Sequence, residues 1–280
     1  MDIKSIITCP ICHTDLDNTL RCPSCNTQYS IYHGVYDIVN RELSENQKIL
    51  WKISDDDLET KASTEIRWQA DAEWIKDYYS RLNDDTREGM RLQELKMNEL
   101  LGGLYGCVCD LATGMGGMLT TLINVAPKDI QIVATDISKQ VLAYTKILTD
   151  NERVSYVATD GRCMSIKDES FDFIVSRAAF GNIPESDKVA KELHRILKTG
   201  GRLIVEGSYI ELGSASYELA KREGLADGMV EEILCEYLRG AGFSKIESIV
   251  VKEAVWAENP YDLLPVAGDK QKFCVIQAVK

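Results

Sequence analysis

The chain has 280 residues, of which 45% are hydrophobic, so it is long and apolar enough for one large domain with a sizeable core and an appendage. Its 44 acidic and 32 basic residues give a formal net charge of −12, which disfavours a general nucleic-acid binder because an acidic surface repels phosphates. No apolar run of about 18 residues and no secretory signal pattern is present, so we expect no membrane span and a cytoplasmic location.

Two C-x-x-C pairs, Cys9 with Cys12 and Cys22 with Cys25, stand close together near the N-terminus. Four thiolates on two tight turns can complete a tetrahedral Zn²⁺ site, and such a closed site has no open position for catalysis. Two reactive thiol pairs or a disulfide clip are the alternative. Residues 29–39 alternate around a glycine and predict a hairpin. We therefore expect a structural zinc ribbon over residues 1–40.

Residues 41–100 connect this ribbon to the rest of the chain. Residues 41–55 are polar and are expected to be a linker, whereas apolar residues from 58 to 101 recur at helical spacing and predict two or three helices. Four aromatic residues in this segment, Trp68, Trp74, Tyr78 and Tyr79, either pack the helices onto a sheet or line a substrate pocket. A helical segment in this position often forms a lid.

Strand and helix patterns alternate over residues 101–280, which predicts an α/β domain with a doubly wound, mostly parallel, seven-stranded sheet. The last two strands have no helix between them and are expected to form an antiparallel pair. The expected strands are 107–111, 130–135, 153–158, 171–176, 202–207, 244–252 and 272–279. The expected helices are 116–126, 138–149, 186–198 and 214–240.

A glycine-rich turn follows the first of these strands at residues 112–117, directly after the acid Asp110, and Asp136 ends the second strand. Glycines permit close backbone approach to a ligand, and an acid after the second strand is the usual acceptor for ribose hydroxyls. This pattern indicates a nucleoside-containing cofactor. A nicotinamide dinucleotide is the competing interpretation, but the full G-x-G-x-x-G pattern is missing, and Asp110 would repel a pyrophosphate while suiting an ammonium group.

Residues 101–280 resemble the class I S-adenosylmethionine-dependent methyltransferases. The matching segments, in the family's order, are "VCDLATGMGGML", "VATDIS", "YVATDGRCMSI", "FDFIVSRAAFGNIP" and "ELHRILKTGGRLIVEG". Ala112 departs from the family pattern because it stands where the first glycine is usual. The N-terminal segment "CPICHTDL…LRCPSCNTQYSIYHGVYDIV" resembles methyltransferase-associated zinc ribbons, including activator subunits of tRNA and protein methyltransferases and the zinc module of rRNA guanine-N1 methyltransferases. The combination is also similar to quinone-type methyltransferases.

The resemblance implies a set of residues that bind S-adenosyl-L-methionine. Asp110 would orient the methionine end, Asp136 would accept from the ribose, and Ile137 would cover one adenine face. Asp160 and Gly161 would read the adenine edge, although a helix N-cap is an alternative role for Asp160. The complete implied set is Asp110, Ala112, Thr113, Gly114, Gly116, Asp136, Ile137, Asp160, Gly161, Ser176 and Arg177, with the last two near the sulfonium.

These features predict a methyltransferase that acts on a small-molecule acceptor, enclosed between the 58–100 helices and the strand exits at 176–182 and 207–211. Glu206, Tyr209 and Glu211 are polar candidates for the acceptor side, but no catalytic residue is assigned because methyl transfer depends largely on alignment. An rRNA or tRNA base methyltransferase is the alternative, and a non-catalytic binding protein that docks through its ribbon is a second. The ribbon also offers a surface for a protein partner or for a homo-oligomer.

Overall fold

The computed structural model describes residues 2–42 and 51–280. The strands are β1 (Ser30–Tyr32), β2 (Val35–Asp37), β3 (Cys107–Asp110), β4 (Gln131–Asp136), β5 (Val154–Ala158), β6 (Phe171–Arg177), β7 (Leu197–Ile210), β8 (Ser244–Val255) and β9 (Lys270–Val279). The α-helices are α1 (Lys61–Arg81), α2 (Asp84–Leu101), α3 (Gly117–Val125), α4 (Lys139–Thr149), α5 (Ser186–Ile196), α6 (Ala215–Arg222), α7 (Ala226–Met229) and α8 (Glu231–Ala241). Short 3₁₀ turns lie at Ile3–Ser5, Asp56–Leu58 and Phe180–Asn182.

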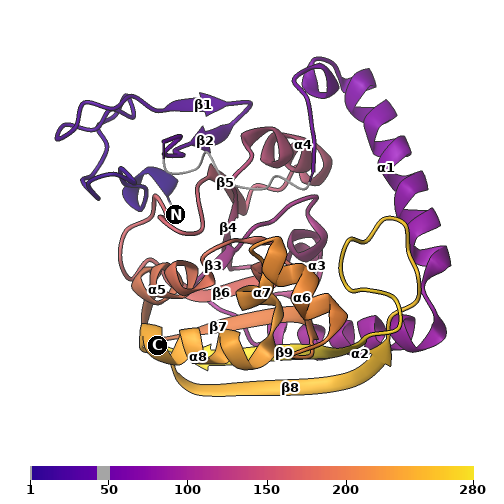
Figure 1. Cartoon of the computed structure of the whole chain (residues 1–280). Helices are drawn as coiled ribbons and strands as arrows, with labels where there is room; N and C mark the ends of the chain where they lie inside the picture. The colour runs from indigo at the N-terminus through magenta and orange to yellow at the C-terminus, as the bar shows by residue number, and fades with distance from the viewer. Residues whose placement is uncertain (1, 43–50) are drawn as a thin grey trace.

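One nine-stranded sheet runs through the molecule in the order β1-β2-β5-β4-β3-β6-β7-β9-β8 (Figure 1). The strands β5, β4, β3, β6 and β7 are parallel, and β9 lies antiparallel between β7 and β8. The seven strands β3–β9 thus confirm the predicted doubly wound sheet and its final antiparallel pair. Parallel strands place the loops that follow them at one edge, and that edge is where ligands bind in such sheets.

The ribbon is joined to this sheet. The hairpin predicted over residues 29–39 is present as β1 and β2, and β2 pairs in parallel with β5 through Tyr36–Val157 and Asp37–Ala158. This extension of the sheet was not expected, because the cysteine spacing and the hairpin pattern carry no information about which strand the hairpin would meet.

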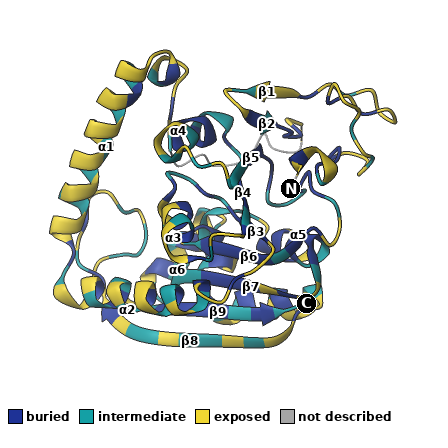
Figure 2. Cartoon of the chain, turned by 180° about the vertical axis from the view of Figure 1, so that it is seen from behind, coloured by how far each residue is buried: buried dark blue, intermediate teal, exposed yellow. Residues whose placement is uncertain are grey.

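Apolar side chains cover both faces of the sheet, and β3 illustrates how they are divided. Cys107 and Cys109 face a cluster formed with α5 and α8, whereas Val108 faces a cluster formed with α2, α3 and α4. This alternation follows from the two-residue period of a strand. Figure 2 shows the buried central strands between helices whose outer faces are exposed. None of the helices in the described part of the chain combines the length and apolar character that a membrane crossing needs.

The middle segment forms two helices, as predicted. Thr60 begins α1 with a capping box that includes Ser63, and the Asn83 side chain begins α2 by accepting from the Thr86 amide. α2 packs against β8 and β9, whereas α1 stands away from the sheet and forms a separate wall (Figure 1). Part of the linker expected at 41–55, residues 43–50, lies outside the described residues.

The single helix expected over residues 214–240 is wrong, because three helices, α6, α7 and α8, occupy this stretch. Gly224 follows α6 with a φ of +71°, which is left-handed backbone, and Val230 is extended between α7 and α8. Neither conformation continues an α-helix. Apolar residues continue at helical spacing through both of these positions, so the sequence pattern predicted one continuous helix.

Candidate functional site

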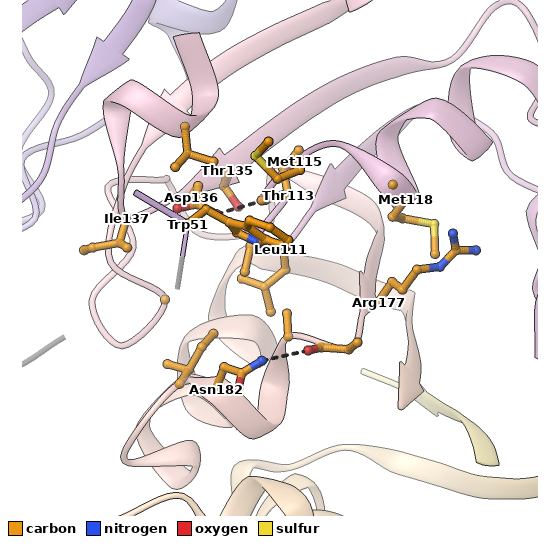
Figure 3. A pocket seen from close by; sticks show the side chains of 18 of the residues that line it. Trp51, Leu111, Thr113, Met115, Met118, Thr135, Asp136, Ile137, Arg177 and Asn182 are labelled. Carbon is orange, nitrogen blue, oxygen red and sulfur yellow. Dashed lines mark hydrogen bonds between the residues drawn. The ribbon is translucent and has the colours of Figure 1, made fainter. Parts of the chain in front are cut away.

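A cavity of about 550 Å³ lies at the carboxyl edge of the sheet, between the strand exits and α1. Its floor comes from residues 111–115, 117 and 118, from Thr135–Ile137, from residues that follow β5, and from the end of β6 and the residues after it, whereas the predicted residue Gly116 does not line it. Its opposite wall comes from Trp51, from α1 and from Asp262. In Figure 3, Thr113 belongs to the loop after β3, Asp136 ends β4 and Ile137 follows it, whereas Arg177 and Asn182 belong to β6 and its exit.

The glycine-rich loop between β3 and α3 has left-handed backbone at Ala112, Gly114 and Gly116, with φ values of 51°, 52° and 83°. A Cβ at Gly116 would lie 2.8 Å from the Thr145 Cγ2 atom, so this position requires glycine. Ala112 adopts the same conformation despite its side chain, at a cost of roughly 1–2 kcal/mol. The loop therefore keeps the geometry that glycine favours even where the sequence departs from it.

Asp136 fixes this loop to the end of β4. Its Oδ2 accepts from the Gly114 amide and its Oδ1 from the Ser138 amide, both at 3.0 Å. Burial raises the pKa of the carboxyl, although these amides oppose the shift. Asp136, Ile137, Ala112, Thr113 and Gly114 all line the cavity.

Asp110 lies behind this surface and is 1% exposed. Neither carboxylate oxygen has a hydrogen-bond partner within the described residues, and burial raises the pKa of the carboxyl to about 7. Arg177 is the cationic group that opposes this rise. A buried carboxylate with two unpartnered oxygens is costly unless a donor reaches it, and Asp110 is not itself among the residues that line the cavity.

Two predicted residues at the exit of β6 have different surroundings. Arg177 lines the cavity, and its Nε donates to the Glu206 Oε2 atom at 3.0 Å. Ser176 is fully buried, and its Oγ donates to the Leu111 carbonyl at 3.2 Å. Ser176 thus supports the glycine-rich loop from below and does not line the cavity.

The turn after β5 brings Gly161 to the cavity, but Asp160 points elsewhere. The Asp160 carboxylate is buried against Arg162, whose Nη2 lies 2.9 Å from Oδ2 and whose amide donates to Oδ1 at 2.9 Å. No helix follows Asp160 before β6 begins, so the N-cap alternative is not realised. Its carboxylate shapes the turn that presents Gly161.

Aromatic rings form the wall opposite the glycine-rich loop. Trp74 stacks on Tyr78 with ring centroids 5.6 Å apart, and Trp51 and Tyr261 meet Trp74 edge-on at 5.6 and 5.3 Å. Trp74, Tyr78 and Tyr79 line the cavity, as one of the two sequence interpretations held. Trp68 does not line it and is 50% exposed.

Sequence reasoning missed several cavity residues, among them Trp51 and Asp262. Trp51 lies within residues 41–55, for which the sequence predicts a linker, and its Nε1 would lie 3.4 Å from a Cβ on Gly114. Asp262 belongs to the loop between β8 and β9, which no motif marks. The only available signal was the length of that loop, since the two antiparallel strands it joins could be linked by far fewer residues.

The polar candidates at the exit of β7 do not form the acceptor side. Glu206 is engaged with Arg177, and Tyr209 is 2% exposed in the apolar cluster formed with α5 and α8. Glu211 is exposed and does not line the cavity. Successive side chains of a strand point to opposite faces of the sheet. A position near the end of β7 therefore did not determine which face each of these three side chains occupies.

The four ribbon cysteines converge. The sulfur atoms of Cys9, Cys12, Cys22 and Cys25 all lie within 4.8 Å of one another, and the Tyr29 hydroxyl lies 3.2 Å from the Cys9 sulfur. Two buried and two exposed thiols around one point fit a tetrahedral ion better than two separate thiol pairs.

Residues 109–205 match the family model described as a methyltransferase domain. A malonyl-[acyl-carrier protein] O-methyltransferase from Marinomonas sp. is 27% identical over 161 residues, which cover 55% of this chain and 58% of that protein. A ubiquinone/menaquinone biosynthesis C-methyltransferase from Hydrogenovibrio crunogenus is 29% identical over 133 residues, covering 45% and 52%. The chain thus spans little more than half the length of these two relatives.

Solved structures support the same fold. A phosphoethanolamine N-methyltransferase 2 from Haemonchus contortus, in complex with S-adenosyl-L-methionine, has a TM-score of 0.53 and 21% identity over 67% of this chain and 52% of that one. A putative methyltransferase from Bacillus halodurans has a TM-score of 0.52 and 18% identity, covering 66% of this chain and 98% of that one. At these identities the likeness concerns the fold. Together with the matching family model, it shows that residues 109–205 have the sequence pattern and the fold of a methyltransferase domain.

Proposed function

We propose that this protein transfers a methyl group from S-adenosylmethionine to a small-molecule acceptor. The observation that carries the proposal is a single cavity in which the glycine-rich loop and Asp136 face an apolar, aromatic wall across about 550 Å³. One side of the cavity has the groups that suit a nucleoside, and the other has the groups that suit a compact acceptor.

S-Adenosylmethionine fits the residues on the floor of the cavity. In this proposal Asp136 accepts from the ribose hydroxyls, and Gly161 and Ile137, which line the same cavity, flank the adenine. The unpartnered oxygens of Asp110 suit the ammonium of the methionine part. When bound, the cofactor supplies an activated methyl group on a sulfonium. The chain's contribution is then to orient that methyl group, to exclude water and to align the acceptor.

A small acceptor is favoured over RNA by the charge of the site. The charged residues among the described cavity lining are Asp136, Arg177 and Asp262, and Arg177 is already paired with Glu206. A polynucleotide needs several cations for its phosphates. One relative is named for malonyl-[acyl-carrier protein] and the other for ubiquinone/menaquinone biosynthesis, and neither name concerns RNA.

We further propose that residues 1–40 form a zinc ribbon, residues 41–100 a linker and lid, and residues 101–280 the methyltransferase domain. Thiolate ligands need a reducing environment, which supports a cytoplasmic location. Because β2 continues the sheet beyond β5, the ion would stabilise an edge of the main sheet as well as the ribbon.

Binding of the cofactor is the first test. Calorimetry with S-adenosylhomocysteine and, separately, with NAD should give binding of the former alone. Tight NAD binding without S-adenosylhomocysteine binding would contradict the proposal. Methyl transfer to a metabolite extract, measured beside transfer to total RNA, then separates the two acceptor classes.

A further inference from the structure

The segment 256–269, between β8 and β9, lies beside the cavity, although neither the cofactor nor the pairing of the strands requires it to be there. β9 is antiparallel to both β7 and β8, so β8 runs in the direction of the parallel strands. Val255 therefore ends β8 at the same edge as the glycine-rich loop, and the segment that follows leaves the sheet on the side of the cavity.

This segment is held at both ends and in the middle. At its base, the Trp256 amide donates to the Asp269 carbonyl and the Gly268 amide to the Trp256 carbonyl, each at 2.9 Å. In the middle, the Tyr261 hydroxyl donates to Asp77 on α1, and the Arg81 guanidinium lies over the Tyr261 ring. Such anchoring fixes the position of the next residue, Asp262.

Asp262 lines the cavity beside the aromatic wall. Its Oδ2 is buried and has no hydrogen-bond partner among the described residues. Burial raises the pKa of the carboxyl to about 6, and the Tyr78 hydroxyl opposes this rise as a hydrogen-bond donor. Of the other charged groups near this wall, Asp77 and Arg81 are engaged with Tyr261, and Arg177 is engaged with Glu206.

Building on the proposed function, we propose that the acceptor is a hydroxylated aromatic compound, whose hydroxyl donates to Asp262 and whose ring packs against Trp74 and Tyr78. Aromatic rings favour stacked or edge-on contact with another planar ring. The unpartnered Oδ2 supplies the acceptor that a phenolic hydroxyl requires when it is buried.

An aliphatic amine fits this arrangement less well. A nearby carboxylate favours the charged form of an amine, and an ammonium nitrogen has no lone pair with which to attack a methyl group. A phenol is neutral at physiological pH and keeps its lone pairs while it donates to a carboxylate. A general base is most effective when its pKa lies near the working pH, and the Asp262 carboxyl meets this condition.

In the resulting step, the phenolic oxygen forms a bond to the methyl carbon while the carbon–sulfur bond breaks, and that electron pair leaves on sulfur. The hydroxyl proton passes to the Asp262 Oδ2 atom and is later released to solvent. The products are an aryl methyl ether, S-adenosylhomocysteine and one proton, so atoms and charge balance.

The test measures binding and not turnover, with the protein saturated by S-adenosylhomocysteine. Calorimetry compares 2-naphthol with its methyl ether, 2-methoxynaphthalene, which has no hydroxyl hydrogen. We expect Asp262→Asn to weaken 2-naphthol binding by about tenfold, as for a hydrogen bond to a charged group, and to leave the ether unchanged. Glu258→Gln is the matched control, because it removes a carboxylate from an exposed position on the same segment.

The pH dependence provides a second readout. Wild-type protein should bind 2-naphthol more tightly at about pH 8 than at about pH 5, because Asp262 is ionised only above its pKa of about 6. Asp262→Asn should lose this difference, and Asp262→Glu should restore it in part. Equal binding of naphthol and ether, no naphthol binding, or an unchanged pH dependence in Asp262→Asn would each overturn the inference. If S-adenosylhomocysteine binds in those same experiments, the proposed methyltransferase function survives that failure.

Discussion

The indole of Trp51 meets Trp74 edge-on with ring centroids 5.6 Å apart, while its Nε1 approaches Gly114. One side chain from the segment before the helices therefore touches both α1 and the glycine-rich loop. The cofactor side and the aromatic wall of the cavity meet at this residue.

Because of this position, binding of S-adenosylhomocysteine should change the tryptophan fluorescence. Trp51→Phe should remove most of the change, since the ligand enters next to this indole. Trp68→Phe is the control, because Trp68 is half exposed and lies outside the cavity. A fluorescence change that survives Trp51→Phe intact would mean that the ligand binds away from the glycine-rich loop.

Asp136→Ala should weaken S-adenosylhomocysteine binding by roughly 1.5–3 kcal/mol, the scale of hydrogen bonds to a charged group. The substitution also frees the Gly114 amide, so the loop loses its link to β4. Calorimetry measures the effect, with Asp129→Ala as the control at an exposed aspartate before β4. Affinities of Asp136→Ala and wild type that agree would contradict the assigned role.

The buried Asp110 carboxyl should make the free energy of unfolding of the ligand-free protein depend on pH. Its folded pKa of about 7 exceeds the value of an unfolded aspartate, so the folded state binds the proton more tightly. The free energy of unfolding should therefore fall as pH rises from about 4 to about 7, by roughly 2–4 kcal/mol from this group.

Urea unfolding of wild type and Asp110→Asn over this pH range measures the effect. The amide cannot ionise, so the variant should lose this part of the decline and be the more stable protein near pH 7. Its affinity for S-adenosylmethionine should nevertheless fall, because the ammonium group loses its counter-charge. A variant less stable than wild type near neutral pH would contradict the raised pKa of Asp110 in the folded protein.

Cys12→Ser should release the metal ion and unfold the first 40 or so residues, because the ion supplies much of the folding energy of so small a unit. The rest of the sheet should stay folded, although the amides of β5 should exchange faster once β2 no longer covers that edge. Elemental analysis and hydrogen exchange measure these effects. Cys163→Ser is the control, since Cys163 lies outside the four-cysteine cluster. Wild-type protein that carries well under one equivalent of metal would contradict the zinc assignment.

Periodicity and motif order predicted most of the sheet domain, because each strand and helix there buries one continuous apolar face. Asp136 and Gly114 were predictable for a different reason. The backbone at a strand-to-helix turn limits which residues fit there. Ser176 and Asp160 show where this reasoning stops. Both belong to matching motifs, yet in this structure one supports a loop and the other binds Arg162.

The aromatic wall was only partly predictable. Helical spacing placed Trp74 and Tyr78 on one helix, but the gap between α1 and the sheet depends on contacts between distant segments. These include the hydrogen bond from the Tyr144 hydroxyl to Asp71 and the contact of Tyr261 with Asp77. Asp262 depends on the same long-range anchoring, which no local pattern encodes.

The most direct test of the central claim is transfer of a tritium-labelled methyl group from S-adenosylmethionine, with a metabolite extract and total RNA as parallel acceptors. We expect label in an extractable small molecule, with little dependence on salt, and a large loss of transfer in Asp136→Ala. Efficient, salt-sensitive labelling of a single RNA species would contradict a small enclosed acceptor and would instead identify an RNA base methyltransferase.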